Sequence, residues 1–401
     1  MTDHRARPRV VIAGMGDSGL LTAIHLARGR SPIPLPWLES QPHCDVVGIS
    51  SKPGLLSGQE LGTRISRPDA WVHDHWISFD RFRGLDRVRT VHGSLVGLDT
   101  ARARVDVALG DGSVVTEPYD VLVISTGVRN GFWRQPTLQT TTDIDRELGE
   151  THTCLDGATS VAVIGGGAAA VSSAANIAAV WPAKNVRLYF PGPRALPAHH
   201  PRVWQHVRSR LDGLGVEVHS GHRAELPCDY GIDRIGTGPV HWTTRQPPAS
   251  ADAVVWAIGA VRPNTEWLPG DLLDEHGFVR VESDLRVVGQ DRIFAVGDVA
   301  ATDPLRNSAR NRADRLMAHN VRATLRGGHR RHYRPRHRRW GSVLGVQREG
   351  LEVFTPGGRP FRFPTWSIDT LLQPWIVRRG IYRGIRDPAS ATADDTGWSG
   401  N

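Results

Sequence analysis

The chain has 401 residues, 39% of them hydrophobic and 22% charged, so it is too long for one small domain and too apolar for a disordered protein. No run of about 18 uncharged apolar residues occurs, which excludes a membrane-spanning helix, and the charged N-terminal residues leave no room for a signal peptide. The net charge of +8 favours anionic ligands or surfaces without choosing among them. We therefore expect a cytoplasmic protein of two or three domains.

The three cysteines, Cys44, Cys154 and Cys228, lie far apart and form no C-x-x-C pair. This spacing argues against a disulfide framework, a zinc site and a dithiol redox centre, so no metal is expected. We predict that the thiols are buried and structural.

The first half of the chain opens with the pattern of a strand, a tight turn and a helix. Residues 9–28 place a β-branched run, a glycine turn and then apolar residues at helical spacing. A Pro-rich loop over 29–43 leads to a second strand at 44–50. Between 88 and 118, short segments joined by a Gly-Asp-Gly turn predict an antiparallel meander, and a buried strand follows at 119–127.

The same pattern restarts at Ser160. A strand, a glycine turn and a helix are followed by predicted strands at 186–190, 216–220 and 251–259 and by a helix at 202–215. Two successive units of this kind predict an α/β fold with two doubly wound domains rather than one enlarged sheet.

The next part of the chain is rich in arginine. A strand at 291–300 contains Gly-Asp and precedes a predicted helix at 308–327. The stretch 326–339 then holds seven arginines and three histidines. It is either a solvated loop or a contact for anionic lipid or phosphate, and no nucleic-acid module accompanies it, so no nucleic-acid partner is expected.

Residues 328–401 predict a basic loop followed by a small α+β domain. Short strands are expected within 342–363, and the Trp- and Arg-rich segment 366–386 follows, with Pro374 interrupting it. This segment either packs against the first domain or lies on a membrane surface. The second alternative places the protein peripherally at the inner face of an anionic membrane.

The first glycine turn has the spacing G-x-G-x-x-G, formed by Gly14, Gly16 and Gly19 after a strand and at the start of a helix. The first glycine permits a tight turn, the second lets the backbone approach a pyrophosphate, and the third lets the helix pack on the strand. The free N–H groups and the dipole of the helix N-terminus favour that anion. The turn therefore predicts a dinucleotide site of Rossmann type.

The second glycine turn has the related spacing G-x-G-x-x-A. It comprises Gly165, Gly167, Ala168 and Ala170, with alanine at the position where the helix packs on the strand. Two pyrophosphate sites in one chain predict two dinucleotides. Electron transfer between a flavin and a nicotinamide is the chemistry that needs such a pair.

The order of these motifs resembles the flavoprotein oxidoreductases with two dinucleotide-binding domains, which include type II NADH:quinone oxidoreductases, apoptosis-inducing-factor-like proteins and ferredoxin reductases. The resemblance covers residues 8–327 and implies an FAD-dependent NAD(P)H oxidoreductase, in which hydride passes to the flavin and electrons then pass to a second acceptor. The implied domains are an FAD-binding domain (1–127 and 285–327, including the meander 88–118), an NAD(P)H-binding domain (128–284) and the C-terminal part (328–401).

The resemblance also implies which residues contact FAD. Asp298, after Gly297, would accept hydrogen bonds from the ribityl chain. Ser50, Ser51 and Lys52 stand where many relatives place an acid for the adenosine ribose, so they would bond the ribose and a phosphate instead. The implied set is Gly14, Gly16, Asp17, Ser18, Gly19, Ser50, Ser51, Lys52, Thr126, Gly127, Gly297, Asp298, Asn307 and Ser308.

The implied nicotinamide nucleotide site also departs from the family. The strand at 186–190 ends without an acid, and Arg194, with His199 and His200 behind it, favours NADPH over NADH; an exposed arginine without a ligand is the alternative. Ser172 stands where many relatives carry a glutamate near flavin and nicotinamide. The implied set is Gly165, Gly167, Ala168, Ala170, Arg194, Gly259 and, nearby, Arg262.

The second acceptor is left open by the sequence. The spacing of the cysteines argues against a disulfide or a sulfide as the acceptor. The helix at 308–327 lacks the pattern with which quinone reductases of the family line their tunnel. A quinone, a small organic substrate or oxygen stays possible, as does a flavin-bearing sensor that is not an enzyme. The aromatic residues within 71–82 are interpreted either as a cover for the flavin or as core or surface contacts.

Overall fold

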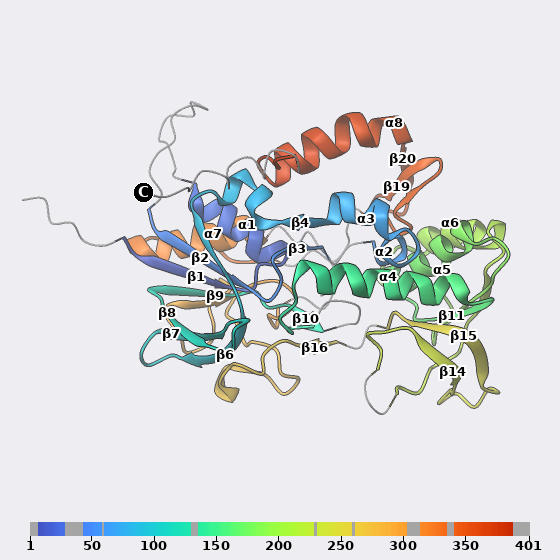
Figure 1. Cartoon of the computed structure of the whole chain (residues 1–401), viewed down its shortest axis with the longest axis horizontal. Coiled ribbons are helices and arrows are strands. Elements are labelled where there is room, and N and C mark those ends of the chain that lie inside the picture. The colour runs from blue at the N-terminus through green and yellow to red at the C-terminus, as the bar shows by residue number, and fades with distance from the viewer. Residues whose placement is uncertain are drawn as a thin grey trace, which may run out of the picture.

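A computed structural model gives the fold and describes residues 7–28, 43–57, 60–129, 135–227, 231–258, 261–302, 313–334 and 341–387. These residues form two α/β units side by side, and the C-terminal segment lies along both of them (Figure 1). The α/β class with two doubly wound units is the one that the sequence predicts.

The first unit is built on a five-stranded parallel sheet with the order β17-β9-β1-β2-β5. Helices α1 (Asp17–Ala27) and α7 (Ala313–Arg326) cover one face, and a three-stranded antiparallel sheet covers the other. The parallel strands are β1 (Arg9–Ala13), β2 (Asp45–Ser50), β5 (Val88–His92), β9 (Val121–Ile124) and β17 (Ile293–Ala295); the antiparallel ones are β6 (Ser94–Asp99), β7 (Arg104–Ala108) and β8 (Val114–Pro118).

Alternate residues of β1 point into two different hydrophobic cores. Ile12 packs with Leu20 of α1 and Met317 of α7, whereas its neighbour Val11 packs with Val105 of β7. Successive side chains of a strand point to opposite faces, so an unbroken apolar run is what a strand covered on both faces requires.

The antiparallel meander starts later than the sequence predicts. The Gly-Asp-Gly turn does join β7 to β8, but residues 88–92 form β5, which pairs in parallel with β2 at the edge of the main sheet. The meander therefore begins at Ser94. The chain crosses between the two sheets at Gly93, where a Cβ would come within 2.9 Å of the Ala108 carbonyl oxygen.

The second unit has a five-stranded sheet with the order β13-β12-β11-β15-β14, in which only the edge strand β14 is antiparallel. Helices α4, α5 and α6 pack against its core. The strands are β11 (Ser160–Ile164), β12 (Asn185–Tyr189), β13 (Glu217–His219), β14 (Gly236–Val240) and β15 (Ala249–Trp256); the helices are α4 (Thr141–Gly157), α5 (Ala168–Val180) and α6 (Pro201–Gly213).

Two connections link the units. Strands β10 (Val128–Arg129) and β16 (Arg262–Pro263) pair antiparallel where the chain passes between them. Hairpin β3–β4 (Gly54–Leu56, Trp76–Ser78) leaves the first unit and carries helix α2 (Leu61–Ser66) onto α5 and helix α3 (Pro68–His75) onto α4 of the second. Trp71 is fully buried there, so it is a core residue.

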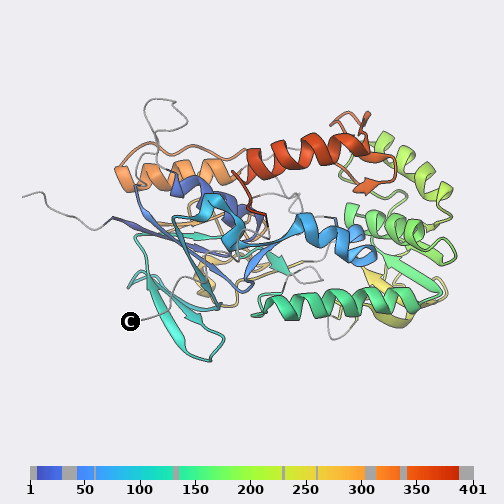
Figure 2. The same cartoon turned by 45° about the horizontal axis from the view of Figure 1, so that its top comes forward.

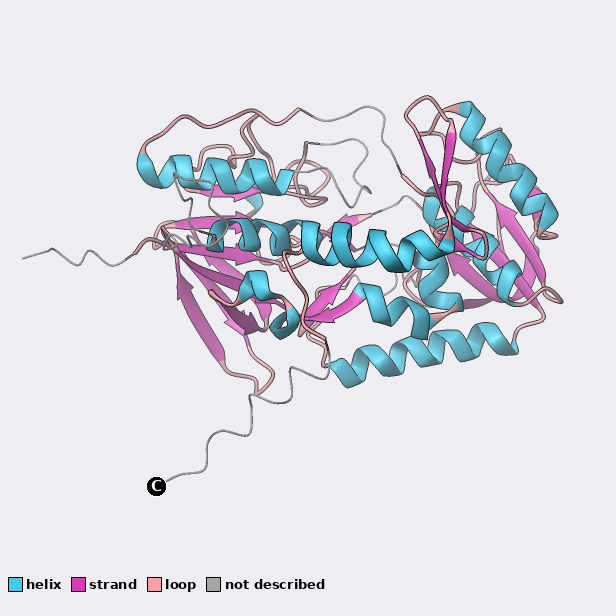
Figure 3. Ribbon diagram, turned by 90° about the horizontal axis from the view of Figure 1, so that it is seen from above, coloured by secondary structure: helices cyan, strands magenta, loops and turns pink. Residues whose placement is uncertain are grey.

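The C-terminal part consists of a hairpin and a helix. The strands are β18 (Val346–Gln347), β19 (Gly350–Phe354) and β20 (Pro360–Phe363), followed by α8 (Thr365–Ser367) and a π-helix over Ile368–Ile381 that passes through Pro374. Figure 2 shows this helix and α7 along one side of the molecule. Figure 3, seen from above, shows it in front, running from the first unit toward the second. The ring centroids of Tyr382 and Phe82 lie 5.4 Å apart, so the C-terminal end of the segment packs against the first unit, as one of the two alternatives predicted. Trp366, Leu371, Trp375 and Ile376 stay exposed.

The prediction of buried thiols is confirmed for one cysteine and wrong for another. Cys44 is buried, but Cys154 is exposed on α4; Cys228 lies outside the described residues.

Part of the basic stretch 326–339 is bound to the first unit. Arg330 donates to Asp284 at 2.6 Å, and the backbone N–H of Arg331 donates to the side chain of Asn320. This part of the stretch is therefore attached to the first unit and is not a free loop.

Candidate functional site

A cavity of about 420 Å³ opens at the carboxyl ends of the strands of the first sheet. Such an edge is where ligands bind in doubly wound folds. Its walls include the first glycine turn, the end of β2, the end of β9 and the residues after β17. Of the residues implied for FAD, Gly14, Gly16, Asp17, Ser18, Ser50, Ser51, Lys52, Thr126, Gly127, Gly297 and Asp298 line it.

Two glycines of the first turn are required by the protein itself. Gly14 has a φ of +100°, and a Cβ there would lie 2.6 Å from the carbonyl oxygen of Ser125. A Cβ on Gly19 would collide with the carbonyl oxygen of Gly14. Gly165 of the second turn repeats this arrangement, with a φ of +140° and a collision with the carbonyl oxygen of Ala257.

The middle glycine of each turn is not required by the protein. Gly16 has φ −70° and Gly167 has φ −87°, which any residue adopts, and a Cβ on either would meet nothing within 4 Å. Each faces open space at the start of a helix. Close approach of a ligand to the backbone is the physical reason for glycine at such a position.

The helices that follow the two turns begin without side-chain caps. Gly16 is the N-cap residue of α1 and Gly167 that of α5, and neither glycine has a side chain that could cap its helix. By contrast, Thr140 and Asp143 form a reciprocal capping box at α4. The uncapped N–H groups and the helix dipole make both glycine turns suitable for an anion.

The end of β2 contributes an amine to the cavity. Lys52 is 7% exposed, and its Nζ donates to the Thr137 carbonyl oxygen at 2.6 Å. Burial lowers the pKa of Lys52 to about 8, against the opposing effect of the Glu147 and Asp143 carboxylates. The Lys52 backbone N–H donates to Ser50 Oγ at 3.1 Å. The serines and the lysine therefore form one polar wall of the cavity.

The crossing between the units adds residues that the sequence did not single out. Thr126 Oγ1 donates to the Asn264 carbonyl oxygen at 2.8 Å, and Asn264 Nδ2 donates back to the Thr126 carbonyl oxygen at 3.0 Å. Asn264, Glu266 and Trp267 line the cavity. Their one signal in the sequence was their place shortly after the predicted strand at 251–259.

Arg194 forms its hydrogen bonds within its own loop. Its guanidinium donates to the carbonyl oxygens of Leu196 at 2.9 Å, Pro197 at 3.2 Å and His199 at 3.3 Å, all within its own loop. The side chain is therefore turned toward the protein and holds the loop behind the second glycine turn. Arg262 lies exposed in β16.

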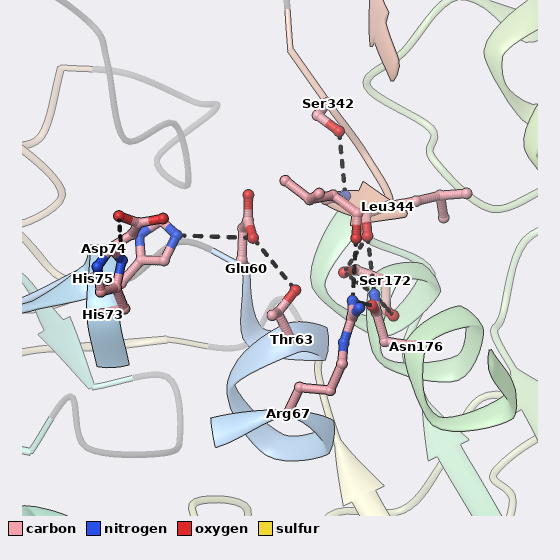
Figure 4. Close-up of polar contacts among 12 residues, drawn as sticks. Glu60, Thr63, Arg67, His73, Asp74, His75, Ser172, Asn176, Ser342 and Leu344 are labelled. Carbon is pink, nitrogen blue, oxygen red and sulfur yellow. Dashed lines mark hydrogen bonds and ion pairs between the residues drawn. The ribbon is translucent and has the colours of Figure 1, made fainter. Parts of the chain in front are cut away.

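Ser172 is buried at the contact between α2 and α5 (Figure 4). Asn176 Nδ2 donates to the Ser172 carbonyl oxygen and to the Leu344 carbonyl oxygen, both at 2.9 Å, and Arg67 donates to Asn176 Oδ1 at 2.7 Å. A Cβ on Gly62 would collide with the Ser172 carbonyl oxygen. Ser172 therefore lies where α2, α5 and the C-terminal hairpin meet. Gly259, Asn307 and Ser308 lie outside the described residues.

The fold and the two glycine turns define a pyridine nucleotide oxidoreductase with two dinucleotide-binding units. A family model for the pyridine nucleotide-disulphide oxidoreductases matches residues 8–324. The chain belongs to this family, which confirms the family predicted from the motifs. As a member, it is an FAD-dependent NAD(P)H oxidoreductase.

Relatives and solved structures agree with this membership. Oxidoreductase ptaL of Pestalotiopsis fici is 25% identical over 73% of this chain and 77% of its own length. Ferroptosis suppressor protein 1 of Xenopus tropicalis is 24% identical over 82% of this chain and 83% of its own. The fold superimposes on a ferredoxin reductase from Rhodopseudomonas palustris with a TM-score of 0.60 at 19% identity, covering 86% of this chain and 88% of that one.

Proposed function

We propose that FAD occupies the cavity of the first unit and that NAD(P)H docks at the second glycine turn. The observation that carries this proposal is the pair of middle glycines, Gly16 and Gly167, which the protein's own backbone does not need. When bound, FAD supplies the carrier that takes two electrons from the donor and passes them on. The chain's residues bind the two dinucleotides and hold them at the junction between the units.

At the first turn, the uncapped N–H groups of α1 bind the FAD pyrophosphate, while Ser50, Ser51 and Lys52 bind the adenosine end. Gly297 has a φ of +82° and lies beside Ser18, so Asp298 follows at a point where the backbone comes close to the cavity. At the second turn, α5 binds the donor's pyrophosphate in the same way. Asn307 and Ser308 keep their implied role at the flavin.

For the acceptor, we propose a quinone held in an anionic membrane. No helix in the described part of the chain is long and apolar enough to cross a bilayer. The C-terminal part instead exposes large apolar side chains, each more than half accessible: Phe361, Trp366, Leu371, Trp375 and Ile376. The Arg379 guanidinium lies 5.0 Å from the Trp375 ring centroid. A segment that exposes Trp, Leu and Arg side chains is typical of contact with the membrane interface.

Valine substitutions at the open glycines test the two dinucleotide sites. Gly16→Val fills the space proposed for the FAD pyrophosphate, so FAD affinity falls by more than about 100-fold, while Gly167→Val leaves FAD bound but blocks the donor. FAD binding is followed by the absorbance near 450 nm, and anaerobic stopped-flow bleaching is recorded with NADPH and with NADH. Gly149→Val, on the exposed face of α4, is the control. Equal FAD affinity in Gly16→Val and the control contradicts the proposed site.

Flotation with vesicles tests the proposed acceptor. The double variant Trp366→Ser and Trp375→Ser loses binding to vesicles that contain anionic lipid, and with it the turnover of a long-chain quinone in those vesicles, but keeps turnover of ferricyanide. Arg208→Ser, from an exposed ion pair on α6, is the control. Unchanged flotation, or a preference for a soluble organic substrate or oxygen in an acceptor panel, overturns the assignment of the acceptor.

A further inference from the structure

An ionisable pair that the two dinucleotide sites do not use lies next to the cavity. Gly54 and Leu56 of β3 line the cavity wall, and Leu56 pairs with Trp76 of β4. His75 immediately precedes Trp76, and its carbonyl oxygen accepts from Ser57 N at 2.9 Å. His75 therefore stands directly behind this wall, at the end of α3.

The partner of His75 is Glu60, the residue before α2. Glu60 Oε2 lies 3.8 Å from His75 Nε2, and the side chains are 21% and 17% exposed. Figure 4 shows the carboxylate and the ring facing one another across a gap. The separation is longer than a hydrogen bond, but the oxygen of one bridging water can lie within hydrogen-bond distance of both groups.

The position of Glu60 is set by its surroundings. Its backbone is left-handed (φ 55°, ψ 49°), an uncommon conformation for a non-glycine residue that persists where the structure fixes it. Thr63 Oγ1 donates to the carboxylate at 3.3 Å. On the other side, Gly345 of the C-terminal hairpin approaches so closely that a Cβ there would lie 3.3 Å from the carboxylate.

Charges from three elements act on His75. Burial and Arg64 lower the pKa of His75, and the carboxylates of Glu60, Asp74 and Asp17 oppose them, so that the pKa lies below its usual 6.5. Asp17 begins α1 and lines the cavity. The ring also stacks on Trp71 at 5.7 Å. His75 is thus coupled electrostatically to the cavity and, once protonated, is a stronger acid than a free histidine.

We propose that His75 and Glu60 deliver the one proton that a quinone acceptor needs beyond the hydride. The overall reaction is NAD(P)H plus quinone plus H⁺ giving NAD(P)⁺ plus hydroquinone, and the hydride supplies both electrons and one proton. A water molecule takes the second proton as the His75 Nε2–H bond breaks, and it passes one of its own protons on, so that an O–H bond forms on the acceptor. Glu60 stabilises the imidazolium beforehand, and water reprotonates the ring afterwards.

This inference rests on the proposed function, because it assumes a two-electron acceptor that takes up protons. His75→Gln and Glu60→Gln are compared with His73→Gln, whose ring is 71% exposed on the same helix. The flavin is first reduced with donor in the absence of oxygen. It is then mixed either with a water-soluble quinone or with ferricyanide, which takes electrons and no proton, between pH 5 and 9.

His75→Gln slows quinone reduction about 100-fold, the scale of general acid catalysis, and removes the decline in rate as pH rises through the pKa of His75. Glu60→Gln moves that decline to lower pH. With ferricyanide, both variants react at the same rate as the control His73→Gln. Equal slowing with ferricyanide, or an unchanged pH profile, overturns the inference. If neither donor reduces the flavin, the proposed function fails instead.

A measurement without FAD or substrate tests the coupling itself. In the ligand-free protein, NMR titration of the His75 ring in Glu60→Gln gives a lower pKa than in the parent, because the stabilising carboxylate is gone. The ring of His73 serves as the internal control. An unmoved His75 titration contradicts the pairing, whatever the activity of the loaded enzyme.

Discussion

The two glycine turns share their backbone geometry but differ in the cation that stands beside them. In the first unit, the buried Lys52 amine has a single carbonyl partner in the described hydrogen bonds, and burial lowers its pKa to about 8. In the second, Arg194 donates to three carbonyl oxygens of its own loop. An incoming anion stabilises the charged form of a lysine held in this way, whereas three carbonyl oxygens already stabilise the charge of Arg194.

The comparison shows which parts of such a site are general and which are selective. The turn and the helix N-terminus are repeated and recognise a pyrophosphate, which FAD and NAD(P)H share. The ends of β2 and β12 carry different chemistry, and these ends face the adenosine part of a dinucleotide. Selectivity between the two ligands is therefore expected at the strand ends and not in the glycine turns.

The largest expected effect is on stability, from alanine at the first glycine of either turn. Gly14→Ala and Gly165→Ala place a Cβ against a backbone carbonyl at a φ that side chains avoid, so each loses more than about 3 kcal/mol of unfolding free energy. Urea unfolding of the ligand-free protein measures this loss. Gly16→Ala and Gly167→Ala change it by less than about 0.5 kcal/mol. Equal losses at Gly14 and Gly16 would break the distinction between structural and ligand-facing glycines.

The next effect separates the two sites in binding. Gly167→Asp gives α5 the side-chain cap that it lacks, so the ligand-free protein is as stable as the parent, but the carboxylate takes the place of the donor's phosphate. The KM for NAD(P)H rises about 30- to 100-fold, because charge-assisted hydrogen bonds worth roughly 2–3 kcal/mol are lost. FAD affinity stays unchanged. Gly149→Asp on exposed α4 controls for the added charge, and an unchanged KM in Gly167→Asp refutes donor binding at this turn.

The sequence predicts these turns well because their geometry is local. A tight turn needs glycine at Gly14 and Gly165 whatever lies elsewhere, so the motif, the flanking strand and the helix are all readable. Helix α2 was missed because its six residues depend on contact with α5, more than a hundred positions away. Helix α4 was also missed, although the Thr140–Asp143 capping box was a local signal for it.

The charged residues were harder to predict than the turns. Sequence supplies the residue type but not the direction of a long side chain, so Arg194 was assigned to a phosphate although it bonds its own loop. Glu60 and His75 lie fifteen positions apart and meet only because the β3–β4 hairpin folds back on itself. Ser172 was expected near flavin and nicotinamide, and its burial beneath the C-terminal hairpin could not be predicted because it depends on residues near 344.

A smaller effect tests Lys52. Its lowered pKa means that the folded, ligand-free protein binds this proton less tightly than the unfolded chain, so stability rises with pH from about 8 toward 10.5. An anionic ligand stabilises the protonated amine and so raises the pKa of Lys52 again. Lys52→Met therefore raises the Kd for FAD about tenfold at pH 7, and the difference from the parent disappears above about pH 9.

Fluorescence titration of FAD at the two pH values measures the Lys52 effect. Lys184→Met is the matched control, because Lys184 bonds carbonyl oxygens of Asp156 and Ala158 in the second unit. A tenfold loss of affinity in Lys52→Met that persists at pH 9 contradicts the role of the ammonium charge and assigns the effect to packing.

The smallest effect on binding is expected at Arg194, and it sharpens the comparison most directly. Because the guanidinium is held by Leu196, Pro197 and His199, Arg194→Ala changes the ratio of kcat/KM for NADPH and NADH by less than about threefold. It instead removes up to about 2 kcal/mol of unfolding free energy through the lost hydrogen bonds. Steady-state kinetics with both donors and urea unfolding measure the two quantities. A tenfold rise in KM for NADPH alone shows that the side chain turns to a 2′-phosphate, and then both sites use a cation at the strand end.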